Sequence, residues 1–456
     1  MTDQSAFTTL LGPDHVFGAN RITNLDPGID ENNLGCDLYV RPADAEEAAQ
    51  VLKHCADNAI PVVTHGGRTG LAGGGRSRTG DIVLSTERMR DPIEIDAEER
   101  VALIGAGWTL QEVQDECAKH NLSPGIDIAA RGSATIGGMI STNAGGMEAW
   151  RNGMMRDRLL GMEVTLTNGE VLSDLTRVKK ANEGYDLKQI FCGAEGTLGV
   201  VTKAVLQLEA LIPAGQTILT AQETAADAIR VMRAIQDRGL LQRAEVMWAT
   251  FAKENAKCLG LPHLTDFHDA PLYVIYEIIG DDDTALEILA PFMEDGTIQN
   301  ALMAQSERER DEIWRLREDS QTLQRDYKTR PESAAAIWFD MSVPLGKLDA
   351  YIADLQARLA KLDYVSTFHS LCHLGDGNLH MTVTGASFTD TQKTEVQMAV
   401  EHGVKAMGGA FSAEHGIGED KRAMLMRCGN GAALGAMQAL KAAFDPNGVL
   451  NVGKVV

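Results

Sequence analysis

The sequence predicts a protein of at least two domains that combines helices with short strands. Its 456 residues exceed the length that one hydrophobic core usually supports. The first half alternates short β-type apolar runs with helix-start signals. The second half places two histidines around a glycine-containing loop in a strand-rich segment. Two or more cores built from both kinds of element are therefore expected.

Local signals place the first elements in order. Residues 44–58 predict a helix, because Asp44 and the acidic residues after it satisfy free amides at a helix start. Residues 61–64 predict a strand, and residues 101–104 predict another. Residues 109–112, Thr-Leu-Gln-Glu, form a capping box that opens a second helix.

Glycine-rich segments follow these elements at residues 65–75, 132–146 and 193–201. Glycines in loops after strands allow backbone amides to approach an anion closely, as diphosphate sites require. A nicotinamide-binding Rossmann unit is disfavoured, because the partial fingerprint at residues 105–110 has Leu110 where a third glycine is needed. A P-loop is disfavoured as well, because no Gly-Lys-Ser/Thr follows the glycines.

A candidate metal site is carried by His373 and His380, which flank a Gly-Asp-Gly loop, and by Glu414. Two imidazoles and one carboxylate leave an open position for a substrate oxygen, as catalytic metal sites require. The adjacent His415 would then be available to move protons. The same ligand set suits iron(II) in an oxygenase, but such proteins need no diphosphate-binding loops.

Composition excludes several functions. The net charge of −22 disfavours a nucleic-acid partner. The first ten residues lack a secretory signal pattern, and no segment reaches the roughly 20 apolar residues of a membrane span. Seven scattered cysteines without a Cys-x-x-Cys pair favour a reducing compartment and disfavour an iron–sulfur cluster. A cytoplasmic protein is expected.

Together these motifs, in this order and with the ending at residues 445–454, resemble the vanillyl-alcohol-oxidase flavoprotein superfamily. Within it, the chain resembles the branch of D-lactate, D-2-hydroxyglutarate and glycolate dehydrogenases. The resemblance implies an α+β fold, with a two-subdomain PCMH-type FAD-binding domain at residues 1–210. A substrate or cap domain with an antiparallel sheet and the metal-binding histidines is expected at residues 211–405. A helical segment returning to the flavin is expected at residues 406–456.

The resemblance also assigns cofactor residues. The diphosphate would lie on the loop that begins at His65, and other residues would line the rest of a non-covalently bound FAD; a covalent bond through His65 is less favoured. The assigned residues are His65, Gly66, Gly67, Arg68, Thr69, Gly70, Leu71, Pro124, Gly132, Ser133, Thr135, Gly138, Ser141, Asn143, Gly145, Gly199, Val201 and Asn451.

The expected reaction is oxidation of a D-2-hydroxy acid to the 2-oxo acid. His415 would take the hydroxyl proton while hydride passes to the flavin, beside a divalent metal for which zinc is favoured and manganese or iron is also suited. Arg317 would bind the substrate carboxylate, because a guanidinium makes two parallel bonds to it. His369 is interpreted as structural. Side chains that would line the substrate are Asn378, Gln321, Trp338 and Thr382.

Three of these side chains depart from the pattern of relatives that handle hydroxyglutarate. Those relatives have threonine, lysine and asparagine at the positions of Gln321, Trp338 and Thr382. The particular 2-hydroxy acid is therefore left open, and Arg325, Lys328 or Arg330 are alternatives for binding a second carboxylate. A metal-free flavin oxidase and a non-catalytic subunit of a glycolate-oxidase-like complex are the alternative functions. Electron-transferring flavoprotein or quinone is expected as electron acceptor, and a homodimer is compatible with the resemblance.

Overall fold

A computed structural model describes residues 4–456. The chain forms two compact units. Unit 1 contains residues up to Leu211 together with Glu414–Val456, and unit 2 contains Ile212–Ala413. The sequence prediction placed the boundaries after residues 210 and 405. The structure confirms the α+β fold class, because both units combine helices with sheets that are mostly antiparallel.

Unit 1 begins with a four-stranded sheet in the order β1-β2-β4-β3. Strands β2 (Leu38–Val40), β4 (Ile82–Ser85) and β3 (Val62–His65) run parallel, and β1 (Val16–Phe17) is antiparallel to β2. Helix α1 (Gln4–Leu11) and helix α3 (Ala45–Asp57) bury Phe7, Val51 and Leu52 in the core beside this sheet.

The predicted helix at residues 44–58 is confirmed as α3, and the Asp44 side chain accepts a hydrogen bond from the Glu47 amide at 2.9 Å. The predicted strand at residues 61–64 is confirmed as β3. The capping box of residues 109–112 is confirmed at the start of α4 (Leu110–Ala118), where Thr109 and Glu112 bond each other's backbone amides.

The second sheet of unit 1 has five antiparallel strands in the order β5-β6-β10-β8-β9. Their bounds are β5 Ile93–Asp96, β6 Val101–Gly105, β10 Val200–Gln207, β8 Leu159–Thr165 and β9 Val171–Asp174. The strand predicted at residues 101–104 is β6. Helix α5 (Ile136–Thr142) buries Ile136, Met139 and Ile140 in the core of this sheet. A two-stranded sheet joins β7 (Leu122–Ser123) to β11 (Glu209–Ala210).

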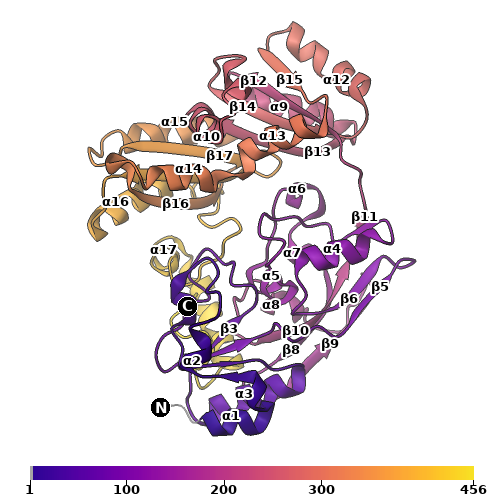
Figure 1. Cartoon of the computed structure of the whole chain (residues 1–456), viewed down its shortest axis with the longest axis vertical. Helices are drawn as coiled ribbons and strands as arrows, with labels where there is room; N and C mark the ends of the chain where they lie inside the picture. Colours follow the sequence, from indigo (N-terminus) through magenta and orange to yellow (C-terminus); the bar gives the residue numbers. More distant parts are fainter. Residues whose placement is uncertain (1–3) are drawn as a thin grey trace. The chain divides into compact units, whose positions relative to one another are not determined.

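The C-terminal part of unit 1 contains helices α17 (Arg422–Cys428) and α18 (Gly431–Phe444). After α18 the chain lies alongside β3, where the Val62 amide donates to the Val449 carbonyl at 2.8 Å (Figure 1). Leu450 is fully buried in the same core as Val62 and Leu52. Residues from both ends of the chain therefore build the domain that carries the glycine-rich loops.

Unit 2 contains one antiparallel sheet of seven strands in the order β15-β12-β14-β13-β17-β18-β16 (Figure 1). The bounds are β12 Gln216–Gln222, β13 Leu241–Trp248, β14 Leu272–Ile278, β15 Asn300–Met303, β16 Ala335–Ser342, β17 Thr367–His373 and β18 Asn378–Gly385.

Helices lie on both faces of this sheet. On one face are α9 (Ala225–Asp237), α15 (Leu348–Leu359) and α16 (Asp390–Glu401); Tyr276 of β14 donates to an α9 carbonyl, and Tyr351 of α15 contacts Met341 of β16. On the other face are α10 (Ala249–Leu259), α13 (Glu307–Glu318) and α14 (Ser320–Tyr327), where Tyr327 contacts His369 of β17. This second face carries His369, His373 and His380.

Helices α11 (His263–Asp266) and α12 (Asp282–Glu294) complete unit 2, and the short helices α2 (Ala19–Ile22), α6 (Ala149–Asn152), α7 (Met155–Arg158) and α8 (Lys188–Phe191) complete unit 1. Among residues 4–456, no helix has the length and apolar character that crossing a bilayer demands. All seven cysteines are free thiols.

Candidate active site

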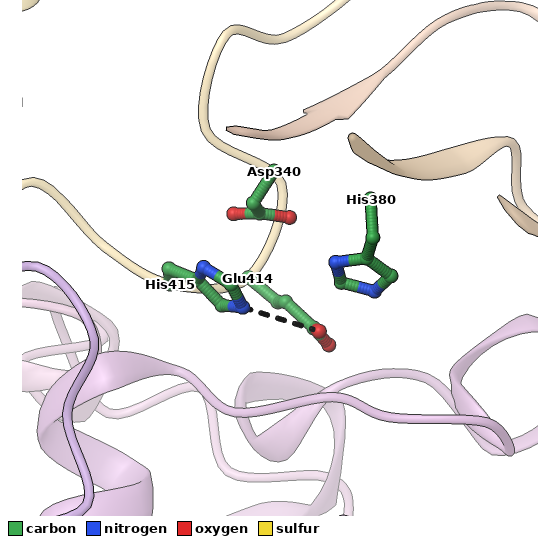
Figure 2. Close-up of side chains that lie close together, drawn as sticks. All are labelled: Asp340, His380, Glu414 and His415. Carbon is green, nitrogen blue, oxygen red and sulfur yellow. Dashed lines mark ion pairs between the residues drawn. The ribbon is translucent and has the colours of Figure 1, made fainter. Parts of the chain in front are cut away.

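Four side chains that can bind a metal ion lie together: Asp340 on β16, His380 on β18, and the consecutive Glu414 and His415 (Figure 2). Their ligand atoms all lie within 4.8 Å of one another. Asp340 is buried, and the other three are partly buried. Imidazole nitrogens with carboxylate oxygens are a donor set suited to zinc, and also to manganese or iron.

Asp340 explains how residues distant in sequence meet. It pairs directly with His380 across β16 and β18. Its Oδ2 accepts a hydrogen bond from the Ala413 amide at 3.1 Å, so Glu414, the next residue, begins beside it. Sequence reasoning gave Asp340 no role. The signal that could have found it is a carboxylate in an otherwise apolar strand segment, Ile-Trp-Phe-Asp-Met.

His373, a predicted ligand, lies outside this group of four but next to it. Its ring is 5.0 Å from the His380 ring between centroids, at nearly a right angle. His373 Nδ1 is 2.7 Å from a carboxylate oxygen of Glu245. Because a carboxylate accepts hydrogen bonds, Nδ1 carries the proton and Nε2 carries the lone pair that a metal requires. Ligation by His373 remains a prediction.

Glu245 on β13 connects His373 to Arg317 of α13. Its second oxygen accepts from Arg317 Nε at 2.7 Å, and the carboxylate is 1% exposed. Burial raises the pKa of Glu245, but the charge of Arg317 and the hydrogen bonds from His373 and Arg317 outweigh it and hold the pKa below its usual value. Sequence reasoning missed this residue, although a carboxylate between the apolar residues Ala244 and Val246 was a usable signal.

Arg317, predicted to bind the substrate carboxylate, is buried in this pairing. Its Nη2 lies 3.4 Å from His373 Nδ1. A guanidinium has five N–H donors, so Arg317 has further donors besides the Nε that bonds to Glu245. The role of Arg317 toward substrate remains a prediction, and the structure adds that Glu245 fixes its position.

The predicted substrate residues occupy different surroundings. Asn378 is buried, and its amide nitrogen donates to Asp340 Oδ1 at 2.9 Å and to the Met341 carbonyl. Trp338 is 55% exposed on β16 and pairs with the partly exposed Thr382 of β18. Gln321 is exposed on α14. Their contacts with substrate remain predictions.

Two of the glycine-rich segments meet in unit 1. A Cβ at Gly67 would lie 1.8 Å from the Ser133 carbonyl oxygen, and a Cβ at Gly66 would lie 2.3 Å from Thr135 Oγ1. Only glycine allows the loop after β3 to approach the loop before α5 so closely. By contrast, a Cβ at Gly70 or Gly132 would meet no atom within 4 Å. The loop after β3 and the loop before α5 together form a backbone-lined surface of the kind that accepts a diphosphate.

His65 ends β3 beneath this loop and is 2% exposed. Its Nε2 lies 2.7 Å from the Gly75 carbonyl, and among the described residues Nδ1 has no hydrogen-bond partner. Burial lowers the pKa of His65 to about 3, so the ring is neutral at physiological pH. Arg68, three residues after His65 in the same loop, has a left-handed backbone and donates to the Tyr39 hydroxyl at 2.8 Å.

The third glycine-rich segment and the Glu-His-Gly-Ile-Gly motif meet at Glu195. Its buried carboxylate accepts hydrogen bonds from the Ile417 and Gly418 amides at 2.6 and 2.8 Å. Burial raises the pKa of Glu195, and these two amides oppose the rise. Asn451 donates to the Glu195 carbonyl and accepts from the Thr64 amide. These bonds position the chain immediately after His415 against the cofactor loops.

The other predicted cofactor residues lie in the same unit, and several hold its backbone. Thr135 caps α5, Ser141 bonds within it, and Asn143 ends it in a left-handed conformation. Gly199 packs against Val164, and Val201 is buried in β10. Pro124 is buried and a Cβ at Gly138 would lie 3.9 Å from the Gly66 Cα, whereas Leu71 is 52% exposed. Thr69 and Gly145 are partly and fully buried, respectively.

Comparisons with known families match both units. The model for FAD linked oxidases, C-terminal domain, matches residues 213–455, and the FAD binding domain model matches residues 36–174. Among curated proteins, the chain is 32% identical over 435 residues to a mitochondrial D-2-hydroxyglutarate dehydrogenase of Rattus norvegicus, covering 92% of this chain and 78% of the relative. A D-2-hydroxyglutarate dehydrogenase of Xanthomonas citri pv. viticola is 32% identical over 429 residues, covering 91% and 88%.

Solved structures share the fold at low identity. Substrate-bound p-cresol methylhydroxylase gives a TM-score of 0.73 at 16% identity, covering 99% of this chain and 95% of the other. The 4-ethylphenol oxidase of Gulosibacter chungangensis gives a TM-score of 0.72 at 16% identity with the same coverage. At this identity the likeness concerns the fold alone.

Proposed function

The chain belongs to the FAD-linked oxidase family of the vanillyl-alcohol-oxidase superfamily and is an FAD-linked hydroxy-acid dehydrogenase, and from this premise we propose a metal-dependent D-2-hydroxy-acid dehydrogenase. The product is the 2-oxo acid. The proposal that the enzyme depends on a metal is supported by the convergence of ligand atoms within 4.8 Å, from Asp340, His380, Glu414 and His415. The printed names of the relatives support a D-2-hydroxy acid as substrate class.

The FAD is held without a covalent bond by the glycine loops of unit 1. The backbone of residues 66–70 would face the diphosphate, because the open space at Gly70 and Gly132 admits a bound group where a side chain would block it. His65 is neutral and buried beneath the loop, so it adds no positive charge to the diphosphate site. When bound, FAD supplies the hydride acceptor.

His380, Glu414 and His373 would hold the divalent ion. The carboxylate of Glu245 fixes the His373 ring with Nδ1 protonated, so that Nε2 can bind metal. Asp340 is engaged by the Asn378 amide and the Ala413 backbone, so it orients the Glu414 segment. When bound, the ion supplies the positive charge that lowers the pKa of a substrate hydroxyl.

His415 takes the hydroxyl proton. Its Nε2 lies 3.8 Å from Glu414 Oε1, so the base stands beside a metal ligand without sharing a short bond with it. A neutral imidazole accepts a proton at cellular pH, whereas a lysine there would mostly be charged already. Arg317 binds the C1 carboxylate through guanidinium donors that Glu245 does not use.

Anaerobic screening of the purified protein tests this proposal. The flavin absorbance is followed while (R)- and (S)-2-hydroxy acids are added, and metal content is measured by elemental analysis. Bleaching by D-2-hydroxy acids, with about one metal ion per chain and loss of bleaching after chelation, is expected. Full bleaching by a metal-free protein would favour the metal-free oxidase instead. Bleaching by no 2-hydroxy acid would overturn the proposal.

A further inference from the structure

One face of the β16, β18 and β17 segment of unit 2 carries its side chains in three successive rows. Cross-strand partners share a face of a sheet, and the same face recurs every second residue. Neighbouring rows are about 7 Å apart along the strands. From the loop end inward, the rows are Ser342–Asn378–His373, Asp340–His380–Leu371, and Trp338–Thr382–His369.

The order of these rows orients a substrate. The middle row supplies His380 and Asp340 of the metal-binding group. The first row contains His373, which Arg317 approaches to 3.4 Å. A 2-hydroxy acid with its hydroxyl at the middle row and its carboxylate toward Arg317 therefore directs its C2 substituent toward the third row. The middle and third rows are two positions apart along each strand, a distance that a substituent of three or four carbons spans.

The third row presents an apolar surface beside the metal group. Trp338 is 55% exposed on the edge strand β16, which is unusual for the largest side chain. Its partner Thr382 is partly exposed and carries a methyl group. Leu371 adds an apolar side chain next to His380 in the middle row. Large aromatic and aliphatic groups around a few polar ones are typical of a ligand pocket.

Of the basic residues in or next to α14 and the third row, His369 and Arg330 are engaged by other side chains, and Lys328 is exposed at the end of α14. His369 is buried against the Tyr327 hydroxyl at 2.9 Å. Arg330, three residues after Tyr327, forms ion pairs with Glu254 at 3.1 Å and with Asp326. Arg325 is exposed and lies two positions after the buried Leu323, on a different side of α14. The described row itself supplies Trp338 and Thr382, neither of which is charged, so a second substrate carboxylate there would lose water against an apolar surface.

We propose that Trp338, Thr382 and Leu371 form the pocket for the C2 substituent and that they select D-2-hydroxy acids with an apolar substituent over dicarboxylates. This inference rests on the proposed function and names its substrate class. A desolvated carboxylate without a partner is rejected strongly, so we expect a preference of about 10²-fold or more in the second-order rate of flavin reduction.

Two acids of similar size test the preference. Anaerobic stopped-flow reduction of the holoenzyme is compared for D-2-hydroxy-4-methylpentanoate and D-2-hydroxyglutarate. Trp338→Lys should lower the rate ratio by about tenfold or more, because it removes the aromatic surface and adds a cation. Trp338→Phe should keep the preference. Tyr185→Lys is the matched control, since Tyr185 is an aromatic residue of unit 1 that is 94% exposed, and it should leave the ratio unchanged.

A binding measurement complements turnover. Titration with 2-oxo-4-methylpentanoate should quench tryptophan fluorescence in the wild type and quench it less in Trp338→Phe. Faster reduction by D-2-hydroxyglutarate in the wild type, or an unchanged ratio in Trp338→Lys, would overturn this inference and leave the proposed function standing. Reduction by neither acid, nor by any other 2-hydroxy acid, would overturn both.

Discussion

At the scale of single residues, Glu245 links His373, a proposed metal ligand, to Arg317, the arginine proposed to bind the substrate carboxylate. Its two oxygens accept from His373 Nδ1 and Arg317 Nε, each at 2.7 Å. One carboxylate therefore sets the tautomer of the histidine and the position of the guanidinium. Sequence motifs identified both partners but gave no role to Glu245, because its strand lies 128 residues before His373 and the pairing arises only from the sheet order.

Glu245→Gln should lower metal affinity by about 10- to 100-fold, because the amide no longer fixes the protonated Nδ1 of His373 with a charge. Affinity is measured by competition with a chelator followed by elemental analysis. Glu277→Gln is the matched control: Glu277 is fully buried in the same sheet and pairs with Arg310 at 2.7 Å, without a histidine partner. An equal loss in both variants, or none in Glu245→Gln, would contradict the assignment.

His65 gives a pH dependence of stability. Its folded pKa of about 3 lies below the usual 6.5, so the unfolded chain binds the proton first as pH falls. The folded state then loses about 1.4 kcal/mol per pH unit from this group between about pH 6 and pH 3. Thermal melting of His65→Asn should depend less steeply on pH in that range than melting of the wild type. The exposed His120→Asn should melt with the wild-type slope, and equal slopes in all three proteins would refute the prediction.

At the scale of elements, the sequence predicted what local chemistry determines. The cap at Asp44, the box at residues 109–112 and the glycines after β3 act within a few residues, and the structure places α3, α4 and the loops there. Asp340 escaped prediction because its partners, the Ala413 amide and Asn378, come from other parts of the chain. Trp338 was predicted to line the substrate, but its exposure could not be predicted, since it depends on β16 lying at the sheet edge.

The two kinds of glycine in the cofactor loops should respond differently to alanine. Gly70→Ala should lower FAD affinity by about tenfold or more while leaving the melting temperature of the FAD-free protein unchanged, because its Cβ meets no protein atom but enters the space assigned to the cofactor. FAD release is measured by flavin fluorescence. Gly435→Ala, in α18 and equally uncrowded, is the control with unchanged affinity. Wild-type FAD affinity in Gly70→Ala would remove the loop from the site.

At the scale of the whole molecule, the two units divide the chemistry. Unit 1 is built from both ends of the chain and carries the FAD loops, whereas unit 2 is one continuous segment and carries Asp340, His373 and His380. Glu414 and His415 follow directly after the last residue of unit 2. The family resemblance that the motifs carry already implied a separate cap domain and a returning end. Composition could not reveal the assignment of Glu414–Val456 to unit 1, because it follows from contacts such as Leu450 with Val62.

The most direct test of the central claim is the rate of flavin reduction by a D-2-hydroxy acid in His415→Ala, measured anaerobically by stopped flow alongside the metal content. If His415 takes the substrate proton and is not a ligand, reduction should slow by about 10²-fold or more while the metal and FAD contents stay at wild-type levels. The exposed His120→Ala serves as control. A near-normal reduction rate in metal-replete His415→Ala would contradict the account.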